Sequence, residues 1–236
     1  MPLDAVFFDV GNTLIHPEPS VGQVCARILL EAGHDHAVDA IDALLPLVDD
    51  YYEDRYRDDD TFWTSDAGAT DVWVGMYSLL CRRLGIPESE APLLARAVYD
   101  AFGSPDRWHA FPDVVPAFER LRAAGLKVGI VSNWDTRLEG ILSGLGLGGL
   151  VDTVVSSAVV GLRKPDPRIF ELACARVGVL PERSAHVGDH MYADIIGARA
   201  AGIRPVLIDR RGDAGGPARR GASRITTLDR LEEALW

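Results

Sequence analysis

The sequence predicts an α/β protein whose core is a doubly wound, Rossmann-like parallel sheet, with an inserted all-α cap domain. In the second half of the chain, short apolar runs alternate with segments of helical length. About ninety residues of helical periodicity separate the first apolar run from the others. Strands buried on both faces form continuous apolar runs, which are typical of parallel sheets, so these patterns predict a parallel core with a helical insert.

Each expected strand ends in a polar or glycine-rich turn. The strands are expected at Ala5–Asp9, Leu126–Ser132, Val151–Ser156, Ser184–Gly188 and Arg204–Ile208. Helices are expected at Pro112–Ala124, Asp135–Leu145, Pro167–Val177, Tyr192–Ala201 and Leu228–Leu235. The glycine-rich segment Asp209–Ser223 is expected to be a mobile surface loop.

The segment from about Pro17 to Arg107 has a different pattern. Apolar residues recur at helical intervals between Val21 and Val48, and further helical stretches cover about Thr70–Leu84 and Ser89–Phe102. We therefore expect a core formed by residues 1–16 and 108–236 and a helical cap at 17–107. The two joints should lie near residues 16–19 and 105–112.

Composition excludes several classes of protein. The chain has 236 residues, 47% of them hydrophobic and 25% charged, with a net charge of −11. An acidic surface without a basic cluster repels the nucleic-acid backbone, so we expect no nucleic-acid partner. The longest uncharged stretch is 140–151. Since a membrane-spanning helix needs about 20 apolar residues, we expect no membrane segment.

The N-terminus and the cysteines indicate the cellular compartment. The first residues contain no basic region and only a short apolar run, which is unlike a secretory signal. The three cysteines lie far apart and have no metal-ligand spacing. These features favour a cytoplasmic protein without disulfides. The sequence predicts no particular oligomeric state.

Polar residues follow several of the expected strands, at the edge where open parallel sheets bind ligands. These residues are Asp9, Ser132, Asn133 and Asp189, with Lys164 in a loop before a helix and Asp194 five residues after Asp189. Taken alone, each could be a turn residue, a helix cap or a surface charge. Together, the carboxylates, hydroxyl, amide and ammonium form a coherent site for an anion held with a divalent cation.

Lys164 is informative because lysine is rare in this chain. Of the 24 cationic residues, only Lys127 and Lys164 are lysines. An ammonium group is a compact charge that can move between phosphoryl oxygens, whereas arginine presents a planar fork.

Four motifs stand in order along the chain. They are Phe7–Leu14 (FFDVGNTL), Val131–Asn133 (VSN), Lys164–Phe170 (KPDPRIF) and Val187–Asp189 (VGD) with Asp194. With a helical insert after the first motif, this ordered set resembles the haloacid dehalogenase (HAD) superfamily, in the subfamily with a helical cap. The stretch 132–170 further resembles one group within that superfamily.

The resemblance implies a Mg²⁺-dependent phosphatase acting on a small phosphorylated substrate. Asp9 would attack phosphorus and form an aspartyl-phosphate that water then hydrolyses. Ser132 and backbone N–H groups near Asn133 would bind the transferring oxygens, and Lys164 would stabilise their negative charge.

The resemblance also implies the ligands of the metal. Mg²⁺ would be held by the carboxylates of Asp9 and Asp189 and by the backbone carbonyl of Gly11. Asp194 would contribute directly or through water.

The first motif departs from the family pattern at Gly11. Family phosphatases usually carry a second aspartate there, two residues after the nucleophile, as general acid and base. Such positioned acid catalysis typically contributes a factor of ~10²–10⁴, so efficient hydrolysis of alkyl phosphates is in question.

Three hypotheses therefore stay open. The chain could be a slow or specialised phosphatase that favours good leaving groups or borrows an acid from elsewhere; nearby candidates are His16, His109, Asp135 and His190. It could be a phosphatase-like binding or regulatory protein, although Asp9 is retained. It could be a metal-free 2-haloacid dehalogenase, but Asp189 and Asp194 are retained as metal ligands. The aromatic residues of the insert are interpreted mainly as its hydrophobic core.

Overall fold

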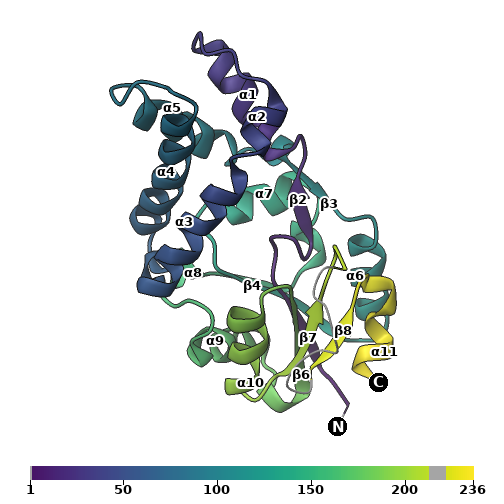
Figure 1. Ribbon diagram of the computed structural model, residues 1–236. Coiled ribbons are helices and arrows are strands. Elements are labelled where there is room, and N and C mark those ends of the chain that lie inside the picture. The colour runs from purple at the N-terminus through teal and green to yellow at the C-terminus, as the bar shows by residue number, and fades with distance from the viewer. Residues whose placement is uncertain (1, 213–221) are drawn as a thin grey trace.

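A six-stranded sheet forms the centre of the computed structural model, which describes residues 2–212 and 222–236 (Figure 1). The strand order is β5-β4-β1-β6-β7-β8, and every neighbouring pair is parallel. The strands are β1 (Ala5–Phe8), β4 (Lys127–Ser132), β5 (Thr153–Ser156), β6 (Ser184–Gly188), β7 (Arg204–Ile208) and β8 (Ser223–Ile225). The expected parallel core is confirmed.

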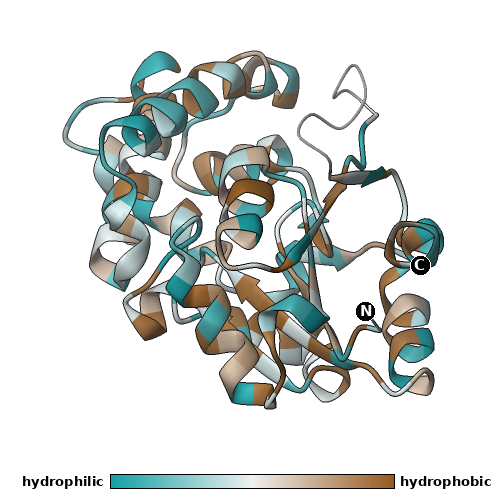
Figure 2. Ribbon diagram, turned by 90° about the horizontal axis from the view of Figure 1, so that it is seen from below, coloured by the Kyte–Doolittle hydropathy of each residue, from teal (hydrophilic) through white to brown (hydrophobic). Residues whose placement is uncertain are grey.

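Helices cover both faces of the sheet, because successive side chains of each strand point to opposite faces and both sets are largely apolar. Val6 and Phe8 of β1 pack with α6 (Val114–Ala123), α7 (Leu138–Gly144) and α11 (Leu231–Leu235). Ala5 and Phe7 pack with α9 (Pro167–Val177) and α10 (Gly197–Ala200). In Figure 2 these helices are banded brown and teal, as expected for amphipathic helices with one buried face.

Shorter helical elements complete the core and the insert. They are α8 (Ser157–Val160), the 3₁₀ turns η1 (Asp60–Thr64), η2 (Pro105–Arg107), η3 (Gly148–Leu150), η4 (Pro181–Arg183) and η6 (Leu228–Arg230), and the π-helix η5 (Met191–Ile196). The helix expected at 192–201 is therefore a π-helical turn followed by the short α10. Such π-helical turns are often found at functional sites.

The expected helical insert is present between the first motif and the rest of the sheet. It consists of α1 (Val21–Glu31), α2 (Val38–Asp42), α3 (Leu45–Asp58), α4 (Asp66–Arg83) and α5 (Ala91–Ala101), which lie above the sheet in Figure 1. The insert has its own cluster of buried apolar side chains, separate from the clusters of the sheet. An antiparallel pair, β2 (Ile15–Pro17) and β3 (Trp108–Ala110), joins the insert to the core.

Two features differ from the sequence expectations. The β2–β3 pair at the joints was not expected, and neither was β8, which begins inside the segment expected to be a loop. Most of that loop, residues 213–221, lies outside the described residues. No helix in the described ranges combines the length and apolar character needed to cross a membrane.

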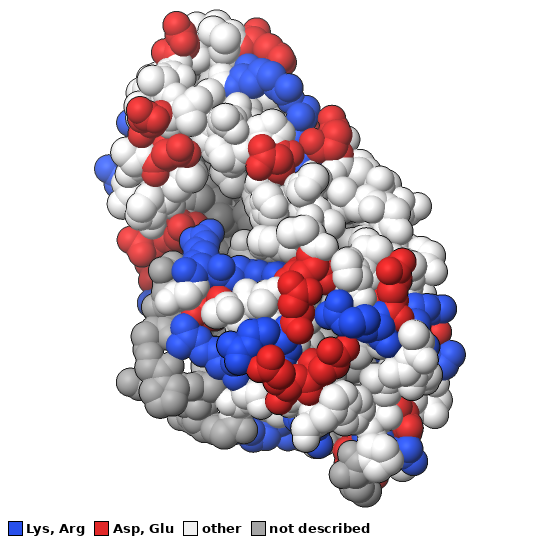
Figure 3. Space-filling model, turned by 90° about the vertical axis from the view of Figure 1, so that its right-hand side faces the viewer, with Lys and Arg blue, Asp and Glu red and all other residues white. Residues whose placement is uncertain are grey.

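Cationic and acidic side chains are interspersed on the side of the molecule that carries α6 and α11 (Figure 3). Arg120 of α6, for example, contacts Glu232 of α11 at 3.1 Å. This ion pair ties the C-terminal helix to α6 over the sheet.

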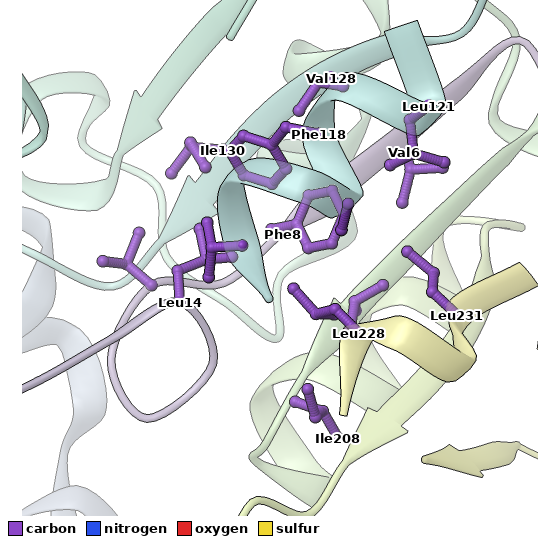
Figure 4. Close-up of a cluster of buried hydrophobic side chains, with 14 of the residues drawn as sticks. Val6, Phe8, Leu14, Phe118, Leu121, Val128, Ile130, Ile208, Leu228 and Leu231 are labelled. Atoms are coloured by element: carbon purple, nitrogen blue, oxygen red, sulfur yellow. The ribbon is translucent and has the colours of Figure 1, made fainter. Parts of the chain in front are cut away.

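The core beneath the first motif is closely packed (Figure 4). The rings of Phe8 and Phe118 are 5.0 Å apart, and both residues are fully buried. Because Asp9 follows Phe8 directly, this contact also fixes the backbone from which the nucleophile candidate projects.

We predict that Phe118→Ala lowers the free energy of unfolding by about 3–5 kcal/mol, because it leaves a cavity under β1. Urea denaturation measures this change. Val115→Ala is the matched control, since Val115 lies on the same helix but is 38% exposed; it should change stability by less than about 0.5 kcal/mol. A similar loss in both variants would contradict the packing described here.

Candidate active site

The carboxyl ends of three adjacent strands bring the first, second and fourth motifs together. Asp9 follows β1, Ser132 is the last residue of β4, and Asp189 follows β6. Since β1 lies between β4 and β6, these three residues reach the same edge of the sheet. The backbone N–H of Asp9 donates to the carbonyl of Val187 at 2.9 Å, which extends the β1–β6 pairing to Asp9 itself.

Lys164 joins the third motif to this edge. Its Nζ donates to Oδ1 of Asp9 and to Oδ1 of Asp194, both at 2.6 Å, and its side chain is almost fully buried. Burial disfavours the ammonium form, but the adjacent carboxylates of Asp194 and Asp9 outweigh it and raise the pKa of Lys164. The lysine is therefore charged throughout the physiological pH range.

The second motif holds both the nucleophile candidate and the lysine loop. The hydroxyl of Ser132 donates to Oδ1 of Asp9 at 2.9 Å. The side chain of Asn133 instead faces the backbone of Lys164: its Nδ2 donates to the carbonyl at 3.0 Å, and its Oδ1 accepts from the N–H at 2.8 Å. The Asn133 side chain thus fixes the lysine loop, a function that its place in the sequence does not indicate.

Asp194 is fixed from several sides. Its Oδ1 accepts from Lys164 and contacts Nε2 of His186 at 2.8 Å, and its Oδ2 accepts from the backbone N–H of His190 at 3.0 Å. Burial favours the neutral acid, but Lys164 and His186 outweigh it and hold the pKa of Asp194 well below its usual range. A Cβ at Gly188 would lie 2.2 Å from Cγ of Asp194, so this position must be glycine.

Asp9, Asp189 and Asp194 form a group that can hold a metal ion. One carboxylate oxygen from each lies within 4.8 Å of the others. Burial, followed by repulsion from Asp9 and Asp194, raises the pKa of Asp189 to about 8. The three carboxylates face only one ammonium group, so the group can accept further positive charge. An all-oxygen donor set of this kind suits Mg²⁺, so the residues fit the expected ion.

The space beside Gly11 contains an aromatic ring. A Cβ built on Gly11 would lie 3.5 Å from the ring of Trp134, which is ordinary van der Waals contact. The Trp134 ring in turn packs against Trp108 of β3, with centroids 5.1 Å apart. The structure therefore has room for a small side chain at Gly11, with an indole ring beside it.

The four residues considered as substitutes for the missing general acid already contact other groups. Both carboxylate oxygens of Asp135 are occupied, by Arg137 at 2.6 and 2.9 Å and by the hydroxyl of Tyr99 at 3.0 Å. His16 and His109 face each other across the β2–β3 pair at the joint. Nδ1 of His190 accepts from the N–H of Ala193 at 3.0 Å.

The helical insert contacts the loops that follow the second motif. Asp66 accepts from the backbone N–H and the hydroxyl of Thr136, at 2.9 and 2.7 Å. Arg137 lies over the ring of Tyr99, 3.7 Å from its centroid, and donates to its carbonyl at 2.6 Å. These contacts place α4 and α5 beside the rim of the site.

A second set of insert contacts reaches the third and fourth motifs. Asp60 forms an ion pair with Arg163, the residue before Lys164. The ring of Tyr56 on α3 packs against His190, with centroids 5.6 Å apart. The insert is therefore tied to residues that directly adjoin Lys164 and Asp189.

Most aromatic residues of the insert belong to its own core, as the sequence interpretation favoured. Phe62, Trp63 and Tyr77 are buried in that cluster, and four others pack against it while partly exposed: Tyr51, Tyr52, Tyr56 and Trp73. Tyr52 is nevertheless close enough to Asp9 and Asp189 for their charges to add to the effect of burial in raising its pKa, so this part of the cluster lies near the site.

Sequence reasoning missed one residue of this network, His186. It is fully buried in the middle of β6 and contacts Asp194. A titratable residue inside an expected buried strand, here Ser184–Gly188, was a signal that could have drawn attention to it.

A family model for haloacid dehalogenase-like hydrolases matches residues 3–202. The chain therefore belongs to this family and is a hydrolase, as its four motifs predicted. The expected fold class, a Rossmann-like parallel sheet with a helical insert, agrees with this assignment.

The relatives include proteins of the group that the stretch 132–170 resembles. Haloacid dehalogenase-like hydrolase domain-containing protein 3 of Danio rerio is 32% identical over 213 residues, which cover 89% of this chain and 87% of the relative. Phosphoserine phosphatase of Thermus thermophilus is 35% identical over 146 residues, which cover 60% of this chain and 58% of that relative.

Solved structures match nearly the whole chain. The Bacillus subtilis HAD hydrolase YfnB, bound to magnesium, has a TM-score of 0.81 at 18% identity and covers 100% of this chain and 99% of its own; this likeness concerns the fold alone. The L-2-haloacid dehalogenase RSc1362 has a TM-score of 0.74 at 25% identity, with coverage of 100% and 99%.

We predict that Asp189→Asn stabilises the metal-free protein increasingly as pH rises. The folded protein keeps the Asp189 proton up to about pH 8, whereas the ordinary value for the unfolded chain is 3.8. Wild-type stability therefore falls through this pH window, and asparagine removes that loss.

Melting temperatures in EDTA between roughly pH 5 and pH 8.5 test this prediction. The melting temperature of the variant minus that of the wild type should increase with pH and level off above pH 8. A difference that is independent of pH would show that burial and the neighbouring carboxylates do not raise the pKa of Asp189 as described.

Proposed function

We propose that this hydrolase is a Mg²⁺-dependent phosphatase that acts on a small phosphorylated metabolite through an aspartyl-phosphate. The arrangement of Asp9 carries the proposal. Its Oδ1 accepts hydrogen bonds from Lys164 and Ser132, while Oδ2 has no hydrogen-bond partner among the described residues. A carboxylate with one oxygen fixed and the other free is suited to nucleophilic attack.

The hydrogen bonds at Asp9 orient the nucleophile and compensate charge. Lys164 lowers the electrostatic cost of bringing a phosphate dianion against a carboxylate, because its ammonium is buried and desolvated. Ser132 fixes the rotation of the carboxylate, and its hydroxyl can also meet a phosphoryl oxygen. The Asn133 side chain holds the lysine loop, which leaves its backbone N–H as the group that we assign to phosphate binding.

The acidic group at the sheet edge would hold the cation. Asp9, Asp189 and the carbonyl of Gly11 are the proposed ligands, and Asp194 would act directly or through water. A bound Mg²⁺ supplies positive charge that neutralises the nucleophile and the phosphate together. The raised pKa of Asp189 supports this assignment, because it reflects burial and then repulsion from Asp9 and Asp194, both of which a bound cation would offset.

The leaving group must depart without an acid at position 11. Since Asp135 is bound to Arg137 and Tyr99, it is not a ready substitute. We therefore propose a phosphatase that favours substrates with good leaving groups, such as aryl or acyl phosphates. Relatives named for phosphoserine and for glyceraldehyde 3-phosphate support a small phosphorylated metabolite as substrate class.

We also propose that residues 17–107 act as a cap domain over a core of residues 1–16 and 108–236. The contacts of Asp60 and Asp66 with loops beside the motifs support this division. Closure of such a cap excludes water and commits the substrate. The three cysteines are buried and free, which supports the proposed cytoplasmic location.

We predict that Asp9→Asn abolishes hydrolysis of p-nitrophenyl phosphate and acetyl phosphate, because the amide cannot attack phosphorus. Each substrate is assayed with Mg²⁺ and with EDTA, and thermal melting checks that the variant is folded. Metal-dependent turnover that disappears in the variant supports the proposal.

Two outcomes of this assay would contradict the proposal. Turnover retained in a folded Asp9→Asn variant would exclude the covalent mechanism. Absence of turnover in the wild type would favour the second function, a phosphatase-like protein that binds a phosphorylated ligand, which the missing acid at Gly11 supports.

We predict that Gly11→Asp increases kcat on alkyl phosphates by up to ~10²–10⁴-fold, because it supplies a proton to a poor leaving group. The structure accommodates its Cβ 3.5 Å from the Trp134 ring. Gly11→Asn is the matched control, since it has the same shape but cannot act as an acid. Equal rates in the two variants would contradict a leaving-group role for this position.

A further inference from the structure

A histidine lies inside the sheet, beneath the acidic group. His186 is the third residue of β6, pairs with Phe7 of β1 and is fully buried. Its ring packs edge-on against Phe170 of α9, with centroids 5.0 Å apart. Burying an imidazole among apolar side chains costs free energy unless it is hydrogen-bonded, so its partner decides what it does there.

The hydrogen bonding of His186 defines its protonation. Nε2 lies 2.8 Å from Oδ1 of Asp194, and Nδ1 is buried without a partner in the part of the chain that the structure describes. An ionised carboxylate only accepts hydrogen bonds, so Nε2 carries the proton and donates. A second proton on Nδ1 would bury an unpaired N–H group. The ring is therefore neutral and donates only through Nε2.

The oxygen that His186 contacts also binds Lys164. Oδ1 of Asp194 lies 2.6 Å from Nζ of Lys164, and the same Nζ lies 2.6 Å from Oδ1 of Asp9. Two donors thus converge on one oxygen, and the lysine extends the chain of contacts to the nucleophile. His186 approaches from within the sheet and has no contact with the open side of the site among the described residues.

We propose that His186 is a positioning residue, which orients Asp194 so that the ammonium of Lys164 stays against Asp9. This inference rests on the proposed function, because it assigns the contact a role in phosphoryl transfer. Without the donor, the Asp194 carboxylate keeps its contacts with Lys164 and the N–H of His190 but loses the one that holds Oδ1 from within the sheet, so the carboxylate and Lys164 can shift together. Charge on Asp9 and on the transferring phosphoryl group is then less well compensated, so the loss falls on kcat.

Three variants test the proposal. His186→Leu removes the donor at similar volume, and His186→Gln keeps an N–H donor that can reach Asp194. Ser184→Ala is the matched control: Ser184 is equally buried in the same strand, and its hydroxyl donates to the carbonyl of Leu180 at 2.9 Å, without contact with the acidic group.

We expect His186→Leu to lower kcat by about 10–100-fold with KM unchanged, which is the usual size of effect for residues that orient catalytic ligands. His186→Gln should recover most of that loss, and Ser184→Ala should keep the wild-type kcat. The proposal is overturned if His186→Leu keeps the wild-type kcat, or if Ser184→Ala loses as much as His186→Leu does.

A measurement on the unmodified protein is independent of activity and of variant folding. Nitrogen NMR of the ¹⁵N-histidine-labelled protein at pH 7 should show His186 as the neutral Nε2–H tautomer. An Nδ1–H tautomer, which has no donor toward Asp194, would overturn the proposal, even for an active enzyme. If the wild type has this tautomer but no turnover, the proposed function fails and the catalytic role of His186 fails with it.

Discussion

A single buried ammonium group organises the site. Lys164 is enclosed by protein and lies 2.6 Å from both Asp9 and Asp194. A buried charge is tolerated only when it is paired and hydrogen-bonded, and removing one partner of such a pair typically costs 3–5 kcal/mol. The two carboxylates and the lysine therefore require one another. This requirement ties β1, the loop before α9 and η5 into one arrangement.

The sheet supplies the geometry that this charge cluster needs. Placing β1 between β4 and β6 brings Asp9, Ser132 and Asp189 to one edge, although Asp9 and Asp189 lie 180 positions apart along the chain. Packing of Phe8 on Phe118 fixes the strand below Asp9. The insert contacts loops beside the motifs, so a movement of the insert also moves loops of the site.

The parallel core, the helical insert and the charged residues that meet at the sheet edge could be predicted from the sequence, because local patterns specify them. Buried strands appear as apolar runs, and polar residues at their ends stand out. The side-chain amide of Asn133 and the ring of His186 could not be assigned in this way, because their partners depend on which way a loop or a strand face points. The β2–β3 pair was not predicted either, because its strands have only three residues each and are separated by about ninety residues of sequence.

The central claim is that Asp9 becomes phosphorylated during turnover. Mass spectrometry of protein quenched in acid during turnover of acetyl phosphate with Mg²⁺ tests it directly. The account predicts a phosphoryl adduct on the peptide that contains Asp9, absent in EDTA and absent from Asp9→Asn. Turnover without any adduct, or with an adduct on a different residue, would contradict it.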